Sequence, residues 1–261
     1  LGRERVLRVD ADRQGRMRPE LLPKIAGPTI LCLQAGNVNS GAFDPASEIV
    51  PLAKAQGAWV HVDGAFGLWA KAVPGLASLA AGFEAADSWA TDAHKWLNVP
   101  YDCGVALVRD AEALQQAMSI SGAYLMLGAE RDAINVTPEC SRRARAIEVW
   151  AALKALGRAG LAEMIARNCE QARWLADRLA AAGVEILNDV VLNQVVLAFG
   201  ADEATKAVVA ALQQAGVCWC GGTNWQSREA MRVSFSSWAT DQDDLEALLE
   251  AILRARSDAG V

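Results

Sequence analysis

Two stretches decide the fold of this chain: HVDGAFG at residues 61–67 and DSWATDAHKWLNVPYDCG at residues 87–104. Each begins with a short strand pattern and ends in a polar turn, and the short apolar runs alternate with helical stretches over the first 125 residues or so. Period-two geometry places His61 and Asp63 on one face of a strand at 58–62, with Asp63 at its carboxyl end. In open α/β sheets, ligands bind outside that end of the strands. We therefore expect Asp63 and Lys95 to lie at one ligand-binding edge of a parallel sheet.

The two side chains suggest a specific chemistry only when they are taken together. The carboxylate of Asp63 could pair with a protonated ring nitrogen, but Asp63-Gly64 is also an ordinary turn signal. Lys95, next to His94 and between two indoles, could lose hydration and so become a nucleophilic amine. Alternatively, it is a surface lysine whose stem lies on Trp96. Pyridoxal phosphate (PLP) requires both groups, one for its pyridine nitrogen and one for its aldehyde carbon.

With these residues, the sequence resembles the group II PLP-dependent amino-acid decarboxylases, which include the aromatic-amino-acid and glutamate decarboxylases. CLQAGNVNSGAFDP at 32–45 is similar to the family's glycine-rich turn, and SRRARAIEVWAALKALG at 141–157 to its connector helix. The resemblance implies an α/β fold of the aspartate aminotransferase type (fold type I). The expected parts are the second half of the PLP-binding large domain at 1–140, connector helices at 141–182 and a small α+β carboxyl-terminal domain at 183–261.

The resemblance also implies a set of roles for single residues. Lys95 is the expected catalytic residue, which binds PLP through a Schiff base, and Asp63 is expected to pair with the pyridine nitrogen. The other expected cofactor-binding residues are Ala65 against one face of the ring, His94 and Asp92 near the phosphate, Ser88 in the same pocket, and Asn37 near the phenolic oxygen, where many relatives have threonine.

Four further polar side chains have alternative roles that the sequence leaves open. His61 is either close to the cofactor site or a core histidine on its strand. Arg142 and Arg143, at the start of the connector helix, and Arg232, on a later strand, could bind a substrate carboxylate through forked hydrogen bonds. Solvated arginines or structural ion pairs are equally open interpretations.

The expected function is PLP-dependent decarboxylation of an L-amino acid, a carboxy-lyase reaction of carboxylic acid metabolism. The segment Trp96–Gly104 favours a decarboxylase over a PLP enzyme of another class (aminotransferase, desulfurase or other carbon–carbon lyase). A catalytically silent association domain is a third interpretation, which the large hydrophobic helices and nine tryptophans would also suit. The family usually forms homodimers, so we expect one here.

Two departures from the family pattern qualify this expectation. The chain opens in mid-pattern at Leu1 and lacks the upstream half of the large domain, so we expect a carboxyl-terminal fragment that by itself binds PLP poorly and is inactive. The stretch at 128–137 has no tyrosine where many relatives carry the one that returns a proton to the carbanion, and Tyr124 lies upstream of it.

The composition and charge pattern argue against nucleic-acid, membrane and metal partners. The formal net charge is −6 and the basic residues form no long run, so we expect no nucleic-acid partner. No apolar run approaches the ~20 residues of a membrane span and we recognise no signal peptide, so we expect no membrane partner. Six irregularly spaced cysteines and two histidines complete no zinc pattern. These features favour a cytoplasmic protein with reduced thiols and no metal.

Local signals predict three further details of the helices. Asp44 followed by Pro45 predicts a helix start with Asp44 as N-cap. The apolar stripe that follows Ser141 is expected to break near Gly157–Gly160, giving two helices. Thr240 with Asp243 resembles a capping box before the last helix.

Overall fold

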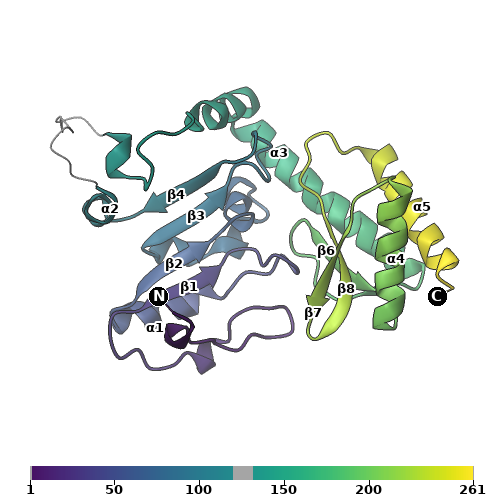
Figure 1. Ribbon diagram of the computed structural model, residues 1–261, viewed down its shortest axis with the longest axis horizontal. Coiled ribbons are helices and arrows are strands. Elements are labelled where there is room, and N and C mark those ends of the chain that lie inside the picture. The colour runs from purple at the N-terminus through teal and green to yellow at the C-terminus, as the bar shows by residue number, and fades with distance from the viewer. Residues whose placement is uncertain (1, 120–131, 261) are drawn as a thin grey trace.

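The computed structural model describes residues 2–119 and 132–260, which form two units connected by a long helix (Figure 1). The first unit contains a four-stranded sheet of order β1-β2-β3-β4, in which β1, β2 and β3 are parallel and β4 is antiparallel to β3. The strands are β1 (Ile30–Gln34), β2 (Trp59–Asp63), β3 (Ser88–Asp92) and β4 (Gly104–Val108). The structure thus confirms the mixed α/β class, and β2 and β3 match the strand patterns expected at 58–62 and at the start of 87–104.

The two faces of this sheet differ in what covers them. On the face that we call the packed face, Leu33, Val60 and Val62 are fully buried against α1 (Ala46–Ala55), the short helices at 67–85 and part of α3 (Ala146–Ala181). On the opposite face, the open face, Ile30 is 60% exposed and Cys32 and Asp63 are also exposed. Alternation along β1 and β2 therefore sends apolar side chains to one face and the candidate site residues to the other.

The helix α3 joins the two units and supplies both cores. It breaks at Gly157, whose φ of 60° and ψ of −176° are not helical, so the expected break is confirmed. After the break, Met164 and Ile165 pack into the core of the first unit, and Leu175 and Leu179 pack into the core of the second.

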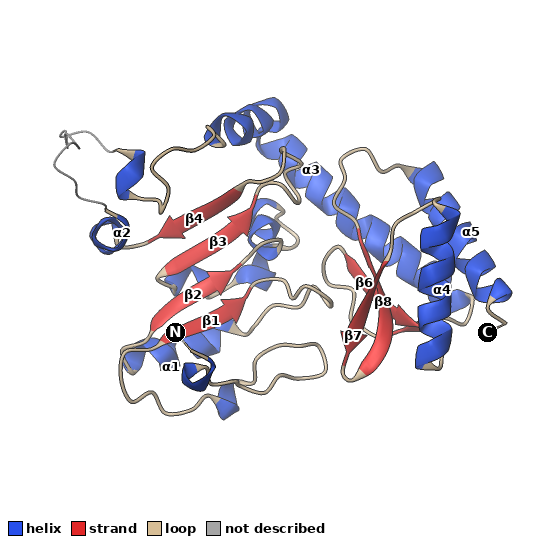
Figure 2. Cartoon of the chain, viewed as in Figure 1, coloured by secondary structure: helices blue, strands red, loops and turns tan. Residues whose placement is uncertain are grey.

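The second unit is an antiparallel sheet with helices on one face (Figure 2). Its order is β5-β6-β8-β7, and α3, α4 and α5 cover the face that carries Leu197 and Met231. The bounds are β5 (Glu185–Ile186), β6 (Gln194–Ala198), α4 (Asp202–Ala215), β7 (Gly221–Trp225), β8 (Arg228–Ser234) and α5 (Gln242–Asp258). The remaining elements are α2 (Ala111–Met118) and the 3-10 helices Arg3–Arg5, Pro19–Leu21, Gly67–Ala72, Ala77–Ala80, Phe83–Ala85 and Ala133–Asn135.

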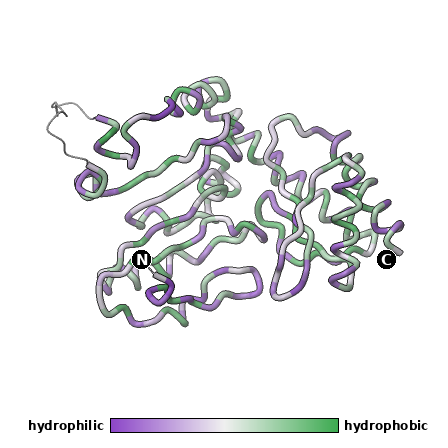
Figure 3. The backbone as a smooth tube through the Cα atoms, viewed as in Figure 1, coloured by the Kyte–Doolittle hydropathy of each residue, from purple (hydrophilic) through white to green (hydrophobic). Residues whose placement is uncertain are grey.

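Hydropathy follows this division into cores and connections. Figure 3 shows hydrophobic segments along the strands of both sheets and the helices that cover them, and hydrophilic segments in the long loops. Within the described residues, no helix is both long and apolar enough to cross a membrane.

Two predicted helix caps are wrong in detail. The carboxylate of Asp44 does not cap α1, because it accepts hydrogen bonds from the backbone N–H groups of Met17 (2.6 Å) and Gln34 (2.7 Å). The capping box of α5 is formed by Asp241 and Asp244, one residue after the predicted pair. At α5 the reciprocal hydrogen bonds of Asp241 and Asp244 form the cap, whereas α1 has no side-chain cap because the Asp44 carboxylate is bonded elsewhere.

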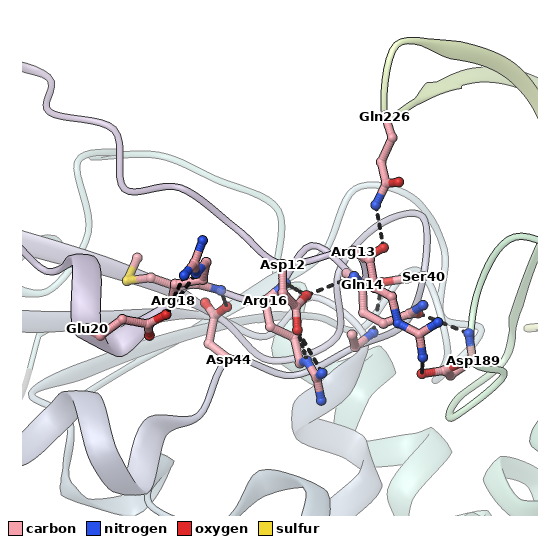
Figure 4. A network of polar contacts seen from close by, with 12 residues as sticks. Asp12, Arg13, Gln14, Arg16, Arg18, Glu20, Ser40, Asp44, Asp189 and Gln226 are labelled. Atoms are coloured by element: carbon pink, nitrogen blue, oxygen red, sulfur yellow. Dashed lines mark hydrogen bonds and ion pairs between the residues drawn. The ribbon is translucent and has the colours of Figure 1, made fainter.

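A turn at residues 12–18 ties the two units together (Figure 4). The nearly buried Gln14 accepts a hydrogen bond at its carbonyl from the Ser40 hydroxyl (2.6 Å) and at its side chain from the backbone N–H of Asp189 (2.9 Å). The side chain of Gln226, at the β7–β8 turn, donates to the carbonyl of Arg13 (2.5 Å). The glycine-rich turn of the first unit is therefore held against the second unit.

Candidate active site

Asp63 and the turn that carries Lys95 lie at the same edge of the first sheet. The parallel register pairs Gln34 with Asp63 and Asp63 with Ala90, so the carboxyl ends of three strands coincide. The carbonyl of Ala65 then accepts hydrogen bonds from the backbone N–H of Asp92 (3.4 Å) and the hydroxyl of Thr91 (3.5 Å). The loop after Asp63 is thus bonded to the strand end that leads to Lys95, at the shared sheet edge that the sequence predicted.

The Lys95 side chain is partly exposed and has two close neighbours. Its Nζ lies 2.6 Å from Asp92 Oδ2 and 5.4 Å from the centre of the Phe66 ring, and the side chain is 38% exposed. The Asp92 carboxylate balances the charge of the ammonium group. The Asp63 carboxylate accepts a hydrogen bond from the backbone N–H of Ala65 (3.2 Å) and is otherwise exposed to solvent on the open face. Both groups can therefore be reached by a ligand.

His94 is fixed by the strand that follows the Lys95 turn. The backbone N–H of Cys103 donates to His94 Nδ1 (3.0 Å), and the imidazole packs against the Tyr101 ring with centres 4.5 Å apart. His94 Nε2 lies 4.0 Å from Asp92 Oδ2. Asp92, His94 and Lys95 therefore form one polar cluster at the end of β3.

Two glycines bring Asn37 to this edge. A Cβ atom on Gly67 would lie 2.1 Å from the carbonyl oxygen of Ala35, and one on Gly36 would lie 3.0 Å from Gly67 Cα. Only glycine permits this close approach between the glycine-rich turn and the loop after Asp63. Asn37 Oδ1 accepts from the backbone N–H of Asn39 (2.9 Å), which holds the turn in place.

Ser88 and His61 lie together further back on the open face. The Trp59 indole donates to Ser88 Oγ (2.8 Å), and Ser88 Oγ lies 2.8 Å from His61 Nδ1. Since the serine oxygen already accepts from the indole, its own proton is available to His61 Nδ1. His61 is half-buried and contacts strand residues, while the role expected for Ser88 in the cofactor pocket stays a prediction.

The arginines that the sequence singled out have structural partners in two of three cases. Arg143 forms an ion pair with Glu148, and Arg232 donates to the carbonyl of Val38 (3.0 Å). Arg142 is exposed. Sequence reasoning did not single out Arg145, which pairs with Asp102 (3.1 Å) and lowers the pKa of that carboxyl group. This pair links the Lys95 turn to the start of α3.

A cavity of about 600 Å³ opens beside Lys95. It lies between the Lys95 turn and a segment of the second unit that follows β8. Its lining consists of His94, Lys95, Asn98, Val99, Tyr101, Ser236, Ser237 and Trp238. Sequence reasoning missed the contribution of residues 236–238, because no local pattern relates them to Lys95. Residues 128–131, the first part of the stretch that lacks the family's tyrosine, lie outside the described residues, and so does Tyr124 upstream of it.

Comparison with known proteins gives a consistent result. Residues 7–199 match the model of the pyridoxal-dependent decarboxylase conserved domain. The acidic amino acid decarboxylase GADL1 of Bos taurus is 33% identical over 69% of this chain and 37% of its own length. The L-2,4-diaminobutyrate decarboxylase of Rhizobium meliloti (strain 1021) is 30% identical over 95% of this chain and 54% of its own. The chain thus spans about half or less of these curated relatives.

Solved structures agree on the fold. The tryptophan decarboxylase of Catharanthus roseus, solved in complex with L-tryptophan, superposes with a TM-score of 0.86 at 21% identity. The match covers 97% of this chain and 57% of that one. At this level of identity the likeness concerns the fold alone, and it confirms the expected fold type I architecture.

Proposed function

The chain belongs to the pyridoxal-dependent decarboxylase family, and on that premise we propose that it takes part in the decarboxylation of an L-amino acid, with Lys95 as the lysine that binds PLP. The observation that carries the proposal is the placement of an exposed aspartate and a reachable lysine at one edge of a parallel sheet. An exposed carboxylate and a primary amine suit the pyridinium nitrogen and the aldehyde of PLP, so the residues present fit the cofactor.

Each of the remaining site residues has a proposed task that its surroundings support. Asp63 would hold the proton on the ring nitrogen, and Ala65, with its small side chain, would pack against the ring. Asn37 and His94 would bind polar groups of the cofactor from the glycine-rich turn and the end of β3. Asp92 lies beside the cofactor-binding lysine, and its contact of 2.6 Å supports a task as counter-ion of Lys95. Bound PLP supplies an electron sink for the bond that breaks at the substrate's α-carbon.

The open face supports a further part of this proposal. Asp63 and Cys32 are exposed there, whereas a working PLP site excludes water from the reacting groups. We propose that additional polypeptide covers this face in the active enzyme and that the 261-residue chain alone binds PLP weakly. Titration of this chain with PLP, followed by absorbance, tests the point: tight binding that depends on Lys95 would contradict it.

A homodimer is the proposed assembly, and a cytoplasmic location is the proposed site of action. The first half of α3 presents Ile147 and Trp150, each 64% exposed, on one side of the helix. Apolar side chains in such a row are typical of protein interfaces.

The exposed Ile147 and Trp150 also support the second candidate function, a silent association domain. Sedimentation of the full-length protein and of Trp150→Glu tests the dimer, which the charge should weaken.

The reaction is tested by release of CO₂ from a panel of amino acids. We would supply acidic, aromatic, basic and diamino acids to the full-length protein with PLP, and to Lys95→Ala as control. CO₂ release that depends on Lys95 is the expected result. Release of ammonia or transfer of the amino group without CO₂ would favour a PLP enzyme of another class. PLP binding without any turnover would favour the association domain.

A further inference from the structure

The segment after β8 is fixed to the first unit by a set of hydrogen bonds to its backbone. The Asn98 amide donates to the carbonyl of Ser236 (2.8 Å) and accepts from the backbone N–H of Trp238 (3.2 Å). On α3, Asn168 donates to the carbonyl of Ser237 (3.2 Å) and Arg167 to that of Trp238 (2.8 Å). Three consecutive backbone positions, residues 236–238, are therefore held by side chains of Asn98, Asn168 and Arg167, which lie outside the second sheet.

Asn98 connects this segment directly to the Lys95 turn. Its backbone N–H donates to the carbonyl of Lys95 (3.2 Å), and its amide also donates to the carbonyl of Trp96 (2.6 Å). Its φ of 56° lies in the left-handed region, which asparagine tolerates better than other residues with a side chain. One residue thus closes the turn of the proposed cofactor-binding lysine and positions residues 236–238.

Buried hydrogen-bonded groups fix the position of the Lys95 turn relative to residues 236–238. The Trp96 side chain is fully buried, and its indole N–H donates to Asn168 Oδ1 (2.9 Å). Asn168 is itself fully buried and donates to Gln171 Oε1 (2.9 Å). Because an unpaired buried polar group costs free energy, displacing one member of this network leaves others unsatisfied.

The Trp238 side chain is exposed, although the backbone of this residue is held by hydrogen bonds. The residue is 67% exposed, although its N–H and its carbonyl both have partners, and it lines the cavity that contains Lys95. The same cavity is lined by Tyr101, which is 82% exposed. Among the described residues that line it, the ionisable groups are those of Lys95, His94 and Tyr101. A large aromatic side chain presented from a fixed backbone is well suited to contact a ligand.

We propose that Trp238 contacts the side chain of the substrate through its indole, and that Asn98 is the positioning residue that places Trp238 beside Lys95. The inference rests on the proposed function, since it assigns a specificity role within the same site. Trp238 recognises the substrate side chain by apolar contact and stacking. The hydrogen bonds between residues 236–238 and the Lys95 turn fix the position of the indole relative to Lys95.

The positioning role is tested by hydrogen exchange in the full-length protein. Asn98→Gly keeps the left-handed backbone accessible and removes the amide, so exchange at the Trp238 amide should rise by roughly 5- to 10-fold, with strand β6 unchanged. Asn98→Asp, which keeps the oxygen acceptor, should restore part of the protection. The matched control is Gln226→Gly, another left-handed residue (φ 52°), whose side chain bonds Arg13 instead. Unchanged exchange at 236–240, or a rise throughout the protein, would overturn the assignment.

The specificity role is tested by steady-state kinetics with Trp238→Ala and Trp238→Phe. For the substrate decarboxylated best, Trp238→Ala should raise KM by about tenfold with kcat within about threefold, and Trp238→Phe should recover much of the loss. PLP absorbance should not change in either variant. An unchanged KM would refute the contact. If the wild-type protein decarboxylates no amino acid, the proposed function and the contact with substrate both fail, and hydrogen exchange alone decides the positioning role of Asn98.

Discussion

The two faces of the first sheet carry side chains from the same strands but have different tasks. On the packed face, Leu33, Val60 and Val62 are fully buried, and helices from three parts of the chain cover them. On the open face, Asp63 is exposed and His61 half-buried, one residue away from those core positions. Strand alternation places the core residues and the proposed cofactor-binding residue on opposite faces, so we expect a substitution on these strands to affect either stability or cofactor binding.

The largest effect should come from a matched pair of truncations on β1. Leu33→Ala should lower the free energy of unfolding by about 2–5 kcal/mol, because it leaves a cavity in the packed face. Ile30→Ala, at a side chain that is 60% exposed, should cost less than about 1 kcal/mol. Urea denaturation of both variants measures the difference. Equal losses would mean that the open face is covered as well as the packed one.

A second pair of variants tests whether Asp63, on the open face, binds PLP. Asp63→Ala should weaken PLP binding to the full-length protein by roughly 10- to 100-fold, since it removes a charge-assisted hydrogen bond. Its stability should change little, because the side chain is exposed. The control is Asp189→Ala, which removes an exposed carboxylate 3.6 Å from Arg13 in the turn between the units. If both variants bound PLP like the wild type, the aspartate would have no part in the site.

A smaller effect should appear in the pH dependence of stability, through Asp44 beside the end of β1. Burial raises the pKa of Asp44 above its usual 3.8, and hydrogen bonds from Gln34 and Met17 oppose this only in part. Between 3.8 and the raised pKa, the folded chain binds more protons than the unfolded chain, so stability falls as the pH rises through this window. Relative to Asp44→Asn, the wild type should therefore lose stability as the pH increases. Urea denaturation at a series of pH values measures this, and the opposite slope would contradict it.

Much of the first unit could be predicted because its signals are local. The strands and their shared edge follow from period-two patterns, and the break in α3 from a single glycine at position 157. The absence of the predicted Asp44 cap does not follow from local sequence, since the Asp44 carboxylate binds the N–H of Met17, which is 27 positions away in the sequence. Local propensity was overridden there by a tertiary contact.

The contribution of Trp238 to the candidate site could not be predicted for a related reason. The bond between Asn98 and Trp238 joins residues 140 positions apart, and neither residue belongs to a pattern that names the other. The exposure of Trp238 also cannot be read from its residue type, because tryptophan is usually well buried. Only the packing of the second unit against the Lys95 turn brings these groups to one cavity.

The proposed site requires that PLP attach covalently to Lys95. The full-length protein and its Lys95→Ala variant would be incubated with PLP, reduced with borohydride, digested and analysed by peptide mass spectrometry. We expect a reduced pyridoxyl group on Lys95 in the wild type and no labelled peptide in the variant. A label on another lysine, or none in the wild type, would contradict the assignment of the site.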